Sequence, residues 1–355
     1  MDWPGLLADA WAAATFRGGY NVSVVVAGTT CLGVAAGLVG SFTFLRRRAL
    51  ISDALSHATL PGIALAFLLG AMLGFEQRSL PLLLAGAAAT GALGVLTVQL
   101  LTRHTRLGED AAIGTVLSVF YGVGIVLLSY IQVVGGAGQA GIKSFILGQT
   151  AAMARHEAIA LAALALLAAG ATMLLLKEFR LVCFDAAFAE AQGWPVFRID
   201  LLMVGLTVVV TVVGLQTVGL ILIVALLILP PVAARFWTDR LSRMLALSAA
   251  FGGTAGFCGA VASAVLPNVP TGAVIVLAAG AIFVVSLAFA PRRGVVAAAL
   301  GQLTLRLRLE EAAALLRLER HGTRPPPLLS ARLRLWGLVD ADGRPTPRGR
   351  SAARN

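Results

Sequence analysis

The chain has 355 residues, of which 58% are hydrophobic and 13% charged, whereas about a quarter of the residues in a soluble domain are charged. The formal net charge of +11 comes mostly from arginines beside long apolar runs, so we attribute it to membrane topology rather than to nucleic-acid binding. Runs of about 20 apolar residues match the hydrocarbon core of a bilayer, and the alternating pattern of an outer-membrane barrel is missing. The composition therefore predicts an all-α, polytopic transmembrane helical bundle.

In chain order, the first predicted element is a short segment at the membrane interface. Residues 3–16 are modestly amphipathic, so we expect residues 1–21 to form an extracytoplasmic or interfacial N-terminal segment. A membrane domain is expected over residues 22–292. Its apolar runs fall near 22–45, 57–75, 80–101, 111–134, 157–176, 200–234, 244–266 and 270–290.

The run at 200–234 is too long for one crossing, because a single helix of that length would span about 52 Å. We expect two short helices that meet near residues 214–217, in the sequence Gly-Leu-Gln-Thr. This division gives about nine membrane helices. A bundle of eight helices is the alternative.

Basic residues support the count of nine. Arg46, Arg47 and Arg48 follow the first run, and the positive-inside rule places them in the cytoplasm. With nine helices the arginines of residues 235–243 fall on the same side, whereas eight helices would place them outside. We therefore expect a multi-pass protein of the bacterial cytoplasmic membrane, with its N-terminus outside and its C-terminus in the cytoplasm.

Glycines within the runs predict close contacts between helices. Gly33 and Gly37 are four residues apart, as are Gly252 and Gly256. Small residues at this spacing let helix backbones approach one another in lipid. The pattern predicts a tightly packed bundle and carries no information about a substrate.

The segment that follows the first run is the most informative in the chain. Asp53 and His57 are four residues apart, so a helix places them on one face. A carboxylate and an imidazole suit Mn²⁺, Zn²⁺ or Fe²⁺ as ligands. Pro61 cannot donate a hydrogen bond to the carbonyl oxygen of His57, which leaves that oxygen for another ligand or a water. The candidate positions for a helix kink or gate are Pro61, Gly62 and Gln216.

Spacing alone leaves two interpretations of this pair open. In one, Asp53 caps a helix at the cytoplasmic surface and His57 bonds a backbone carbonyl. In the other, the pair binds a metal ion in transit, because ionisable side chains at membrane depth are costly and predict function. The other predicted spans are almost free of ionisable side chains, which favours the metal. Two copies of the chain about a two-fold axis would supply a weak, transient site of four ligands.

Residues 46–67 resemble the signature of the zinc/manganese/iron permease family of ABC importers, which have the type II importer architecture. The resemblance covers roughly residues 20–290 and includes Ser144–Gly148 and Val213–Gly219. It implies a pair of permeases, two cytoplasmic ATPase subunits and an extracytoplasmic metal-binding protein. It also implies that Asp53 and His57 coordinate the metal during transit.

A short helix is predicted in the largest loop on the cytoplasmic side, at residues 185–195. Its N-cap is an Asp and its end is marked by a Gly, followed by Trp-Pro. Such a segment is most often a simple loop helix, but its place in the family-like order favours a coupling helix that docks on an ATPase subunit. The residues expected to make this contact are Asp185, Ala186, Phe188, Glu190, Gly193 and Pro195.

The basic segment at residues 293–355 is expected in the cytoplasm. Helices predicted at 310–320 and 328–338, followed by a tight turn, are similar to the second half of a winged-helix module. A clear first helix and a cluster of metal ligands are missing, which disfavours binding to nucleic acid. The other interpretation is a small folded tail that touches the ATPase or anionic membrane lipid.

The function predicted from the sequence is that of a permease subunit for a divalent transition metal, either manganese, zinc or iron. We expect no permanently bound cofactor and no catalytic activity in this chain, since it has no phosphate loop, HExxH or GxSxG motif. ATP would then be hydrolysed by a separate partner subunit. An intramembrane enzyme and an ATP-independent metal channel or carrier are the alternatives. The choice between the metals, and between a homodimer and a pair of related permeases, stays open.

Overall fold

The computed structural model describes residues 3–46, 49–73, 80–134, 150–266, 269–291 and 293–321, with a few further residues between 333 and 348. The chain divides into two compact units, Met1–Leu287 and Ala288–Asn355, and each is described by itself. Within the described residues, nine helices are long and apolar enough to cross a membrane. The predictions of an all-α bundle and of nine rather than eight helices are confirmed.

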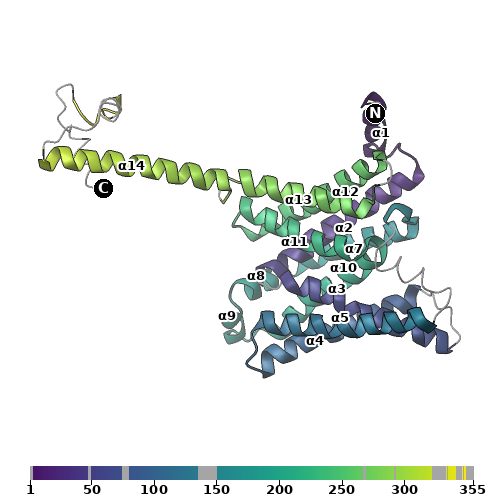
Figure 1. The fold of residues 1–355 in the computed structure, drawn as a ribbon. Coiled ribbons are helices and arrows are strands. Elements are labelled where there is room, and N and C mark those ends of the chain that lie inside the picture. The colour runs from purple at the N-terminus through teal and green to yellow at the C-terminus, as the bar shows by residue number, and fades with distance from the viewer. Residues whose placement is uncertain are drawn as a thin grey trace. The chain divides into compact units, whose positions relative to one another are not determined.

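The long helices follow the apolar runs of the sequence (Figure 1). The long apolar helices are α2 (Tyr20–Leu45), α3 (Ala49–Leu73), α4 (Leu80–His104), α5 (Glu109–Val134), α7 (Arg155–Leu174), α10 (Val196–Val218), α11 (Leu220–Trp237), α12 (Leu241–Val265) and α13 (Thr271–Phe289). One short helix, α1 (Trp3–Ala14), precedes them, and the short helices η2 (Thr150–Ala152), α8 (Leu176–Phe184) and α9 (Ala186–Ala191) connect them. In the second unit, α14 spans Val295–His321.

The long run divides at Gly219, not at the predicted 214–217. Gly219 has φ 86°, a left-handed conformation that favours glycine, and its amide donates to the Leu215 carbonyl at 3.0 Å to end α10. Gly214 lies inside α10, where it lets the side chain of Ile223 in α11 pack closely. The predicted split is thus correct, but its predicted position is wrong, because Gly214 serves the contact between the two helices and Gly219 makes the turn.

Helix α2 is largely buried and packs closely against α12. A Cβ at Gly33 or at Gly252 would collide with the backbone of the other residue, so the two backbones touch. The hydroxyl of Thr29 donates to the Gly256 carbonyl at 3.1 Å. The hydroxyl of Ser248 donates to the Gly37 carbonyl at 2.6 Å. We call this contact the α2–α12 seam.

Helix α11 contains two adjacent prolines, Pro230 and Pro231. Proline has no amide N–H, so the carbonyls four residues earlier, Leu226 and Leu227, lose their usual helical donors. The Leu227 carbonyl instead faces Gly40 of α2, where a Cβ would collide with it. The close contact between α2 and α11 therefore requires a glycine at position 40.

Helices α8 and α9 lie together at the end of the bundle where α2 terminates (Figure 1). An apolar cluster fixes them there, in which Phe179, Val182 and Ala189 are fully buried. The rings of Phe42 and Phe179 meet edge to face with centroids 4.9 Å apart. We call this the Arg46 end of the bundle, after the residue that caps α2 there.

The second unit consists of α14 and the residues that fold back on it. Leu333 and Val339 are buried against Ala314 and Leu338, and the amide of Thr346 donates to the Leu338 carbonyl at 3.0 Å. The helix predicted at 310–320 is the last part of α14. Most of the helix predicted at 328–338 lies outside the described residues, so the similarity to a winged-helix module stays a prediction. Separate roles for residues 1–21 and 293–355 also stay predictions.

Candidate functional site

The predicted ligand pair lies on α3, as the spacing requires. The Nε2 atom of His57 is 3.5 Å from the Oδ1 atom of Asp53. Both side chains are partly buried, since 23% of the His57 side chain and 38% of that of Asp53 are exposed. The pair therefore shares one face of α3 and is accessible from outside the single chain.

Helix α5 brings an aromatic ring onto His57. The rings of His57 and Tyr121 meet edge to face, with centroids 4.9 Å apart and an interplanar angle of 82°. One turn further along α5, Gly124 packs directly on Leu60 and Pro61 of α3. The glycine and the proline ring together let the two helices approach closely enough for Tyr121 to contact the imidazole.

A cavity of about 670 Å³ extends from His57 to several helix ends. It is lined by parts of α3 and α5, by η2, by the turn between α10 and α11, and by the first residues of α13. Among these lining residues, His57 has the only imidazole side chain. Its Nδ1 atom is buried and has no hydrogen-bond partner within the described part of the chain. The cavity is therefore lined by one imidazole, whose Nδ1 atom is buried in this structure.

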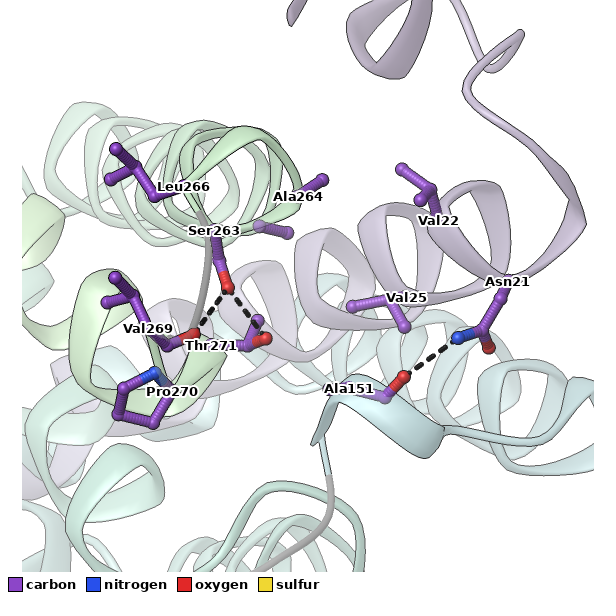
Figure 2. Close-up of a pocket in the computed structure, with 11 residues that line it drawn as sticks. Asn21, Val22, Val25, Ala151, Ser263, Ala264, Leu266, Val269, Pro270 and Thr271 are labelled. Carbon is purple, nitrogen blue, oxygen red and sulfur yellow. Dashed lines mark hydrogen bonds between the residues drawn. The ribbon is translucent and has the colours of Figure 1, made fainter. Parts of the chain in front are cut away.

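A second cavity, of about 500 Å³, lies at the end where α2 begins, and Figure 2 shows its lining. The Asn21 amide donates to the Ala151 carbonyl at 2.9 Å. The Ser263 hydroxyl lies 2.8 Å from that of Thr271 and donates to the Val269 carbonyl at 3.2 Å. These groups satisfy one another, so this cavity offers a metal ion no comparable ligand. The bonds tie η2 to α2, and α12 to α13, beside the mouth of the larger cavity.

The other predicted gate residues contribute in different ways. Pro61 lies within α3 and contacts α5, as described above. Gly62 faces Gly86 of α4, and a Cβ at either glycine would collide with the other backbone. Gly62 is thus a helix-packing position, and its role as a gate stays a prediction. Gln216 lies in α10, but its side chain is not among those that the structure describes. The whole of Ser144–Gly148 also lies outside the described residues.

The predicted coupling segment forms the short helix α9. The Oδ1 atom of Asp185 accepts a hydrogen bond from the Phe188 amide at 2.9 Å, so Asp185 is the N-cap, and Gly193 has φ 82° after the helix. On the outer face Phe188 and Trp194 are 51% and 42% exposed. The remaining predicted contact residues are Ala186, which is partly buried, and Glu190 and Pro195, which are exposed.

One ion pair at the Arg46 end was not predicted. Asp200, in the second turn of α10, is only 8% exposed, and its Oδ1 atom lies 3.2 Å from Arg46 Nε. Sequence reasoning used Arg46 as a topology signal and as the start of the family-like segment, and it did not consider Asp200. An acidic residue at the edge of a long apolar run, with an arginine at the same end, was the signal available.

The described residues of a single chain do not complete a metal site. Within the described residues, there is no group of three or more His, Cys, Asp or Glu side chains that could hold a metal ion. Asp53 and His57 supply two ligands, so a stable complex needs further ligands from water or another chain.

The fold and the site together define a polytopic helical membrane protein with a cavity lined by His57, the imidazole of a carboxylate–imidazole pair. The chain belongs to the ABC 3 transport family, whose model matches residues 20–290. Nearly the whole of the membrane bundle lies within this match.

Three relatives illustrate the range of the family. The chain is 43% identical over 296 residues to the manganese transport system membrane protein MntC of Bacillus subtilis, covering 83% of this chain and 67% of the relative. It is 43% identical over 276 residues to the zinc transport system membrane protein TroC of Treponema pallidum, covering 78% and 91%. Identity to the chelated iron transport system membrane protein YfeC of Yersinia pestis is 32% over 266 residues, covering 75% and 85%.

Solved structures share the fold. PsaBC from Streptococcus pneumoniae, in complex with Fab, matches with a TM-score of 0.65 and 30% identity, covering 78% of this chain and 94% of the other. An ABC transporter in an inward-facing conformation matches with a TM-score of 0.59 at 17% identity, covering 79% of this chain and 97% of the other. The second match shows the common fold alone.

Proposed function

We propose that the chain is the permease subunit of an ATP-binding cassette importer that moves Mn²⁺, Zn²⁺ or Fe²⁺ across the cytoplasmic membrane. The observation that carries the proposal is the Asp53–His57 pair, whose imidazole lines the cavity. Its chemistry suits a divalent transition metal. Family membership supports it, because the three relatives are named as membrane proteins of manganese, zinc and chelated iron transport systems.

The ion is held briefly by ligands from two permeases. Each chain contributes the Asp53 carboxylate and the His57 imidazole, and a two-fold axis beside α3 and α5 brings the two pairs together. The partial exposure of both side chains on one chain supports this arrangement. Four ligands assembled from two chains can separate again when the chains move, which suits a site that must release its ion.

Topology gives the cavity a direction. Arg46, Arg103 and Arg240 lie at helix ends that would share one side of the membrane, which the positive-inside rule places in the cytoplasm. The mouth of the cavity beside η2 and the start of α13 then faces outside. An extracytoplasmic metal-binding protein delivers the ion to this mouth, and His57 is the first nitrogen ligand that it meets.

A partner ATPase docks on α9. Exposed aromatic side chains at Phe184, Phe188 and Trp194 surround this short helix, and an apolar patch of this kind is typical of a protein contact. Aromatic residues also gather at membrane interfaces, so contact with lipid is the competing explanation. The buried Ala189 on the opposite face fixes α9 to the bundle. A movement of the ATPase against the outer face of α9 would therefore move the helices that contact Ala189.

The proposal is tested by metal uptake into vesicles that contain the permease and its partner subunits. We expect the double variant Asp53→Ala, His57→Ala to lose at least about 90% of ATP-dependent uptake, since two metal ligands per chain disappear. The matched control is His104→Ala, Asp110→Ala, which removes an exposed imidazole and carboxylate at other helix ends and should transport normally.

Two outcomes would contradict the proposal. Wild-type uptake in the Asp53, His57 double variant would remove the metal site. Equal uptake with and without ATP would favour a channel or carrier. Comparing Mn²⁺, Zn²⁺ and Fe²⁺ in the same vesicles then identifies the transported ion.

A further inference from the structure

We infer that Arg46 is a positioning residue for energy coupling. It holds α8 and α10, the helices before and after α9, to the end of α2. The next helix, α3, carries Asp53 and His57. The inference rests on the proposed function, in which α9 receives the movement of the ATPase. It assigns a role to a partly buried ion pair that the metal site does not explain.

Arg46 makes two contacts in different directions. Its Nε atom donates to the Asp200 carboxylate at 3.2 Å, and its Nη1 atom donates to the Val182 carbonyl at 3.0 Å. The side chains of Arg46 and Asp200 are 20% and 11% exposed. A planar guanidinium with two fixed donors orients its partners in a way that a flexible ammonium does not.

The two partners lie immediately on either side of the coupling segment. Val182 is in the last turn of α8, just before the N-cap of α9 at Asp185. Asp200 is in the second turn of α10, shortly after Pro195. Arg46 thus contacts both α8, which precedes α9, and α10, which follows it, so α8 and α10 cannot separate while both contacts persist.

The same residue is next to the metal helix. Arg46 caps α2, its amide donating to the Phe42 carbonyl at 3.0 Å, and α3 begins at Ala49. Asp53 and His57 lie in the first turns of α3. A displacement of α9 that moves α8 and α10 therefore reaches the start of α3 through Arg46, in addition to the apolar contact of Leu55 in α3 with Val204 in α10.

Apolar contacts also join the helices at this end. Phe42, Phe179 and Ala189 pack in an apolar cluster, and apolar contact is non-directional. Such a cluster keeps the helices together but allows them to slide. The charge-assisted bonds of Arg46 add direction to the contact, which is what transmission of a movement requires.

The experiment uses the complete transporter in vesicles and measures ATP hydrolysis and metal uptake in the same sample. We expect Arg46→Ala to assemble with the ATPase and to hydrolyse ATP at close to the wild-type rate, while metal transported per ATP falls about tenfold. Arg46→Lys retains the charge beside Asp200 but not the rigid fork, so its ratio should be intermediate. The control is Arg243→Ala, which removes an exposed arginine in the first turn of α12. This variant should transport as much metal per ATP as the wild type.

Removing Arg46 leaves a buried carboxylate, so the variant Arg46→Ala, Asp200→Asn removes that charge as well. It should fold at least as well as Arg46→Ala and still transport little metal per ATP. If a folded Arg46→Ala variant transports as much metal per ATP as Arg243→Ala, the inference is overturned. So does a parallel fall of hydrolysis, uptake and recovered complex in all three Arg46 variants, because that result indicates a structural role only.

The failures of the inference and of the proposed function are distinguishable. If Asp53→Ala, His57→Ala abolishes uptake while Arg46→Ala has a normal ratio, only the inference fails. If Phe188→Ala still binds and responds to the ATPase as the wild type does, docking through α9 fails and the inference fails with it.

Discussion

The α2–α12 seam and the surroundings of His57 are built in opposite ways. At the seam, Gly33 and Gly252 bring two backbones into contact, and the Thr29 and Ser248 hydroxyls bond across it. Around His57 a cavity of about 670 Å³ separates the helices, and a buried imidazole nitrogen has no partner within the described part of the chain.

The difference indicates which part of the bundle is fixed and which part must change. In lipid, helices associate through close packing and hydrogen bonds, and the seam uses both. A buried polar atom without a partner destabilises a membrane bundle; under the proposed function, binding of an ion at His57 would offset this cost. The seam then provides the reference against which α3 and α5 move.

The strongest way to break this comparison is to separate the seam. Gly252→Val places a side chain against the Gly33 carbonyl, and we expect it to destabilise the bundle by roughly 3 kcal/mol and to reduce the folded protein in membranes severely. The control is Gly280→Val in α13, where a Cβ meets nothing within 4 Å. Unfolding in detergent measures both, and equal stability of the two variants would contradict a rigid seam.

A smaller effect is expected at the open region. Tyr121→Ala removes the ring that contacts His57, so the imidazole loses a partner that fixes its orientation, and KM for metal uptake should rise about three- to tenfold with little change in kcat. Tyr121→Phe keeps the ring and should behave as the wild type does. Tyr130→Ala, on the same helix and 56% exposed, is the control; an equal rise in KM there would mean that the contact with His57 is irrelevant.

The smallest effect is expected from the hydrogen bond that Thr29 makes across the α2–α12 seam. Thr29→Val keeps the side-chain shape but removes the hydrogen bond to Gly256 in α12, and should cost about 0.6 kcal/mol of stability. Thr254→Val is the matched change, because that hydroxyl bonds only within its own helix, to the Ala250 carbonyl at 2.7 Å. A stability difference near zero between the two variants would assign the seam to backbone packing alone.

Sequence reasoning predicted most of the fold, since each crossing is a long apolar run and the arginines distinguish nine helices from eight. It misplaced the division of the long run, because Gly214 and Gly219 look alike in a sequence. Only the structure shows that one is needed for packing and the other for a left-handed turn.

The site was predicted less completely. The spacing of Asp53 and His57 was enough to place them on one face, because that relation is local to a helix. The contacts of Tyr121 with His57 and of Arg46 with Asp200 join residues far apart in the chain. They depend on which helices become neighbours, and no periodicity in a single sequence gives that information.

The paired prolines of α11 have a mechanical consequence. Two successive rungs of the helical hydrogen-bond ladder are missing where the Leu227 carbonyl rests on Gly40, and a helix bends most easily at such a gap. The first residues of α11 after the Gly219 turn line the large cavity, and Ile223 and Leu226 pack in the same apolar cluster as α2. A bend at the prolines would change the width of the cavity beside Gly219, and it would require this cluster to rearrange.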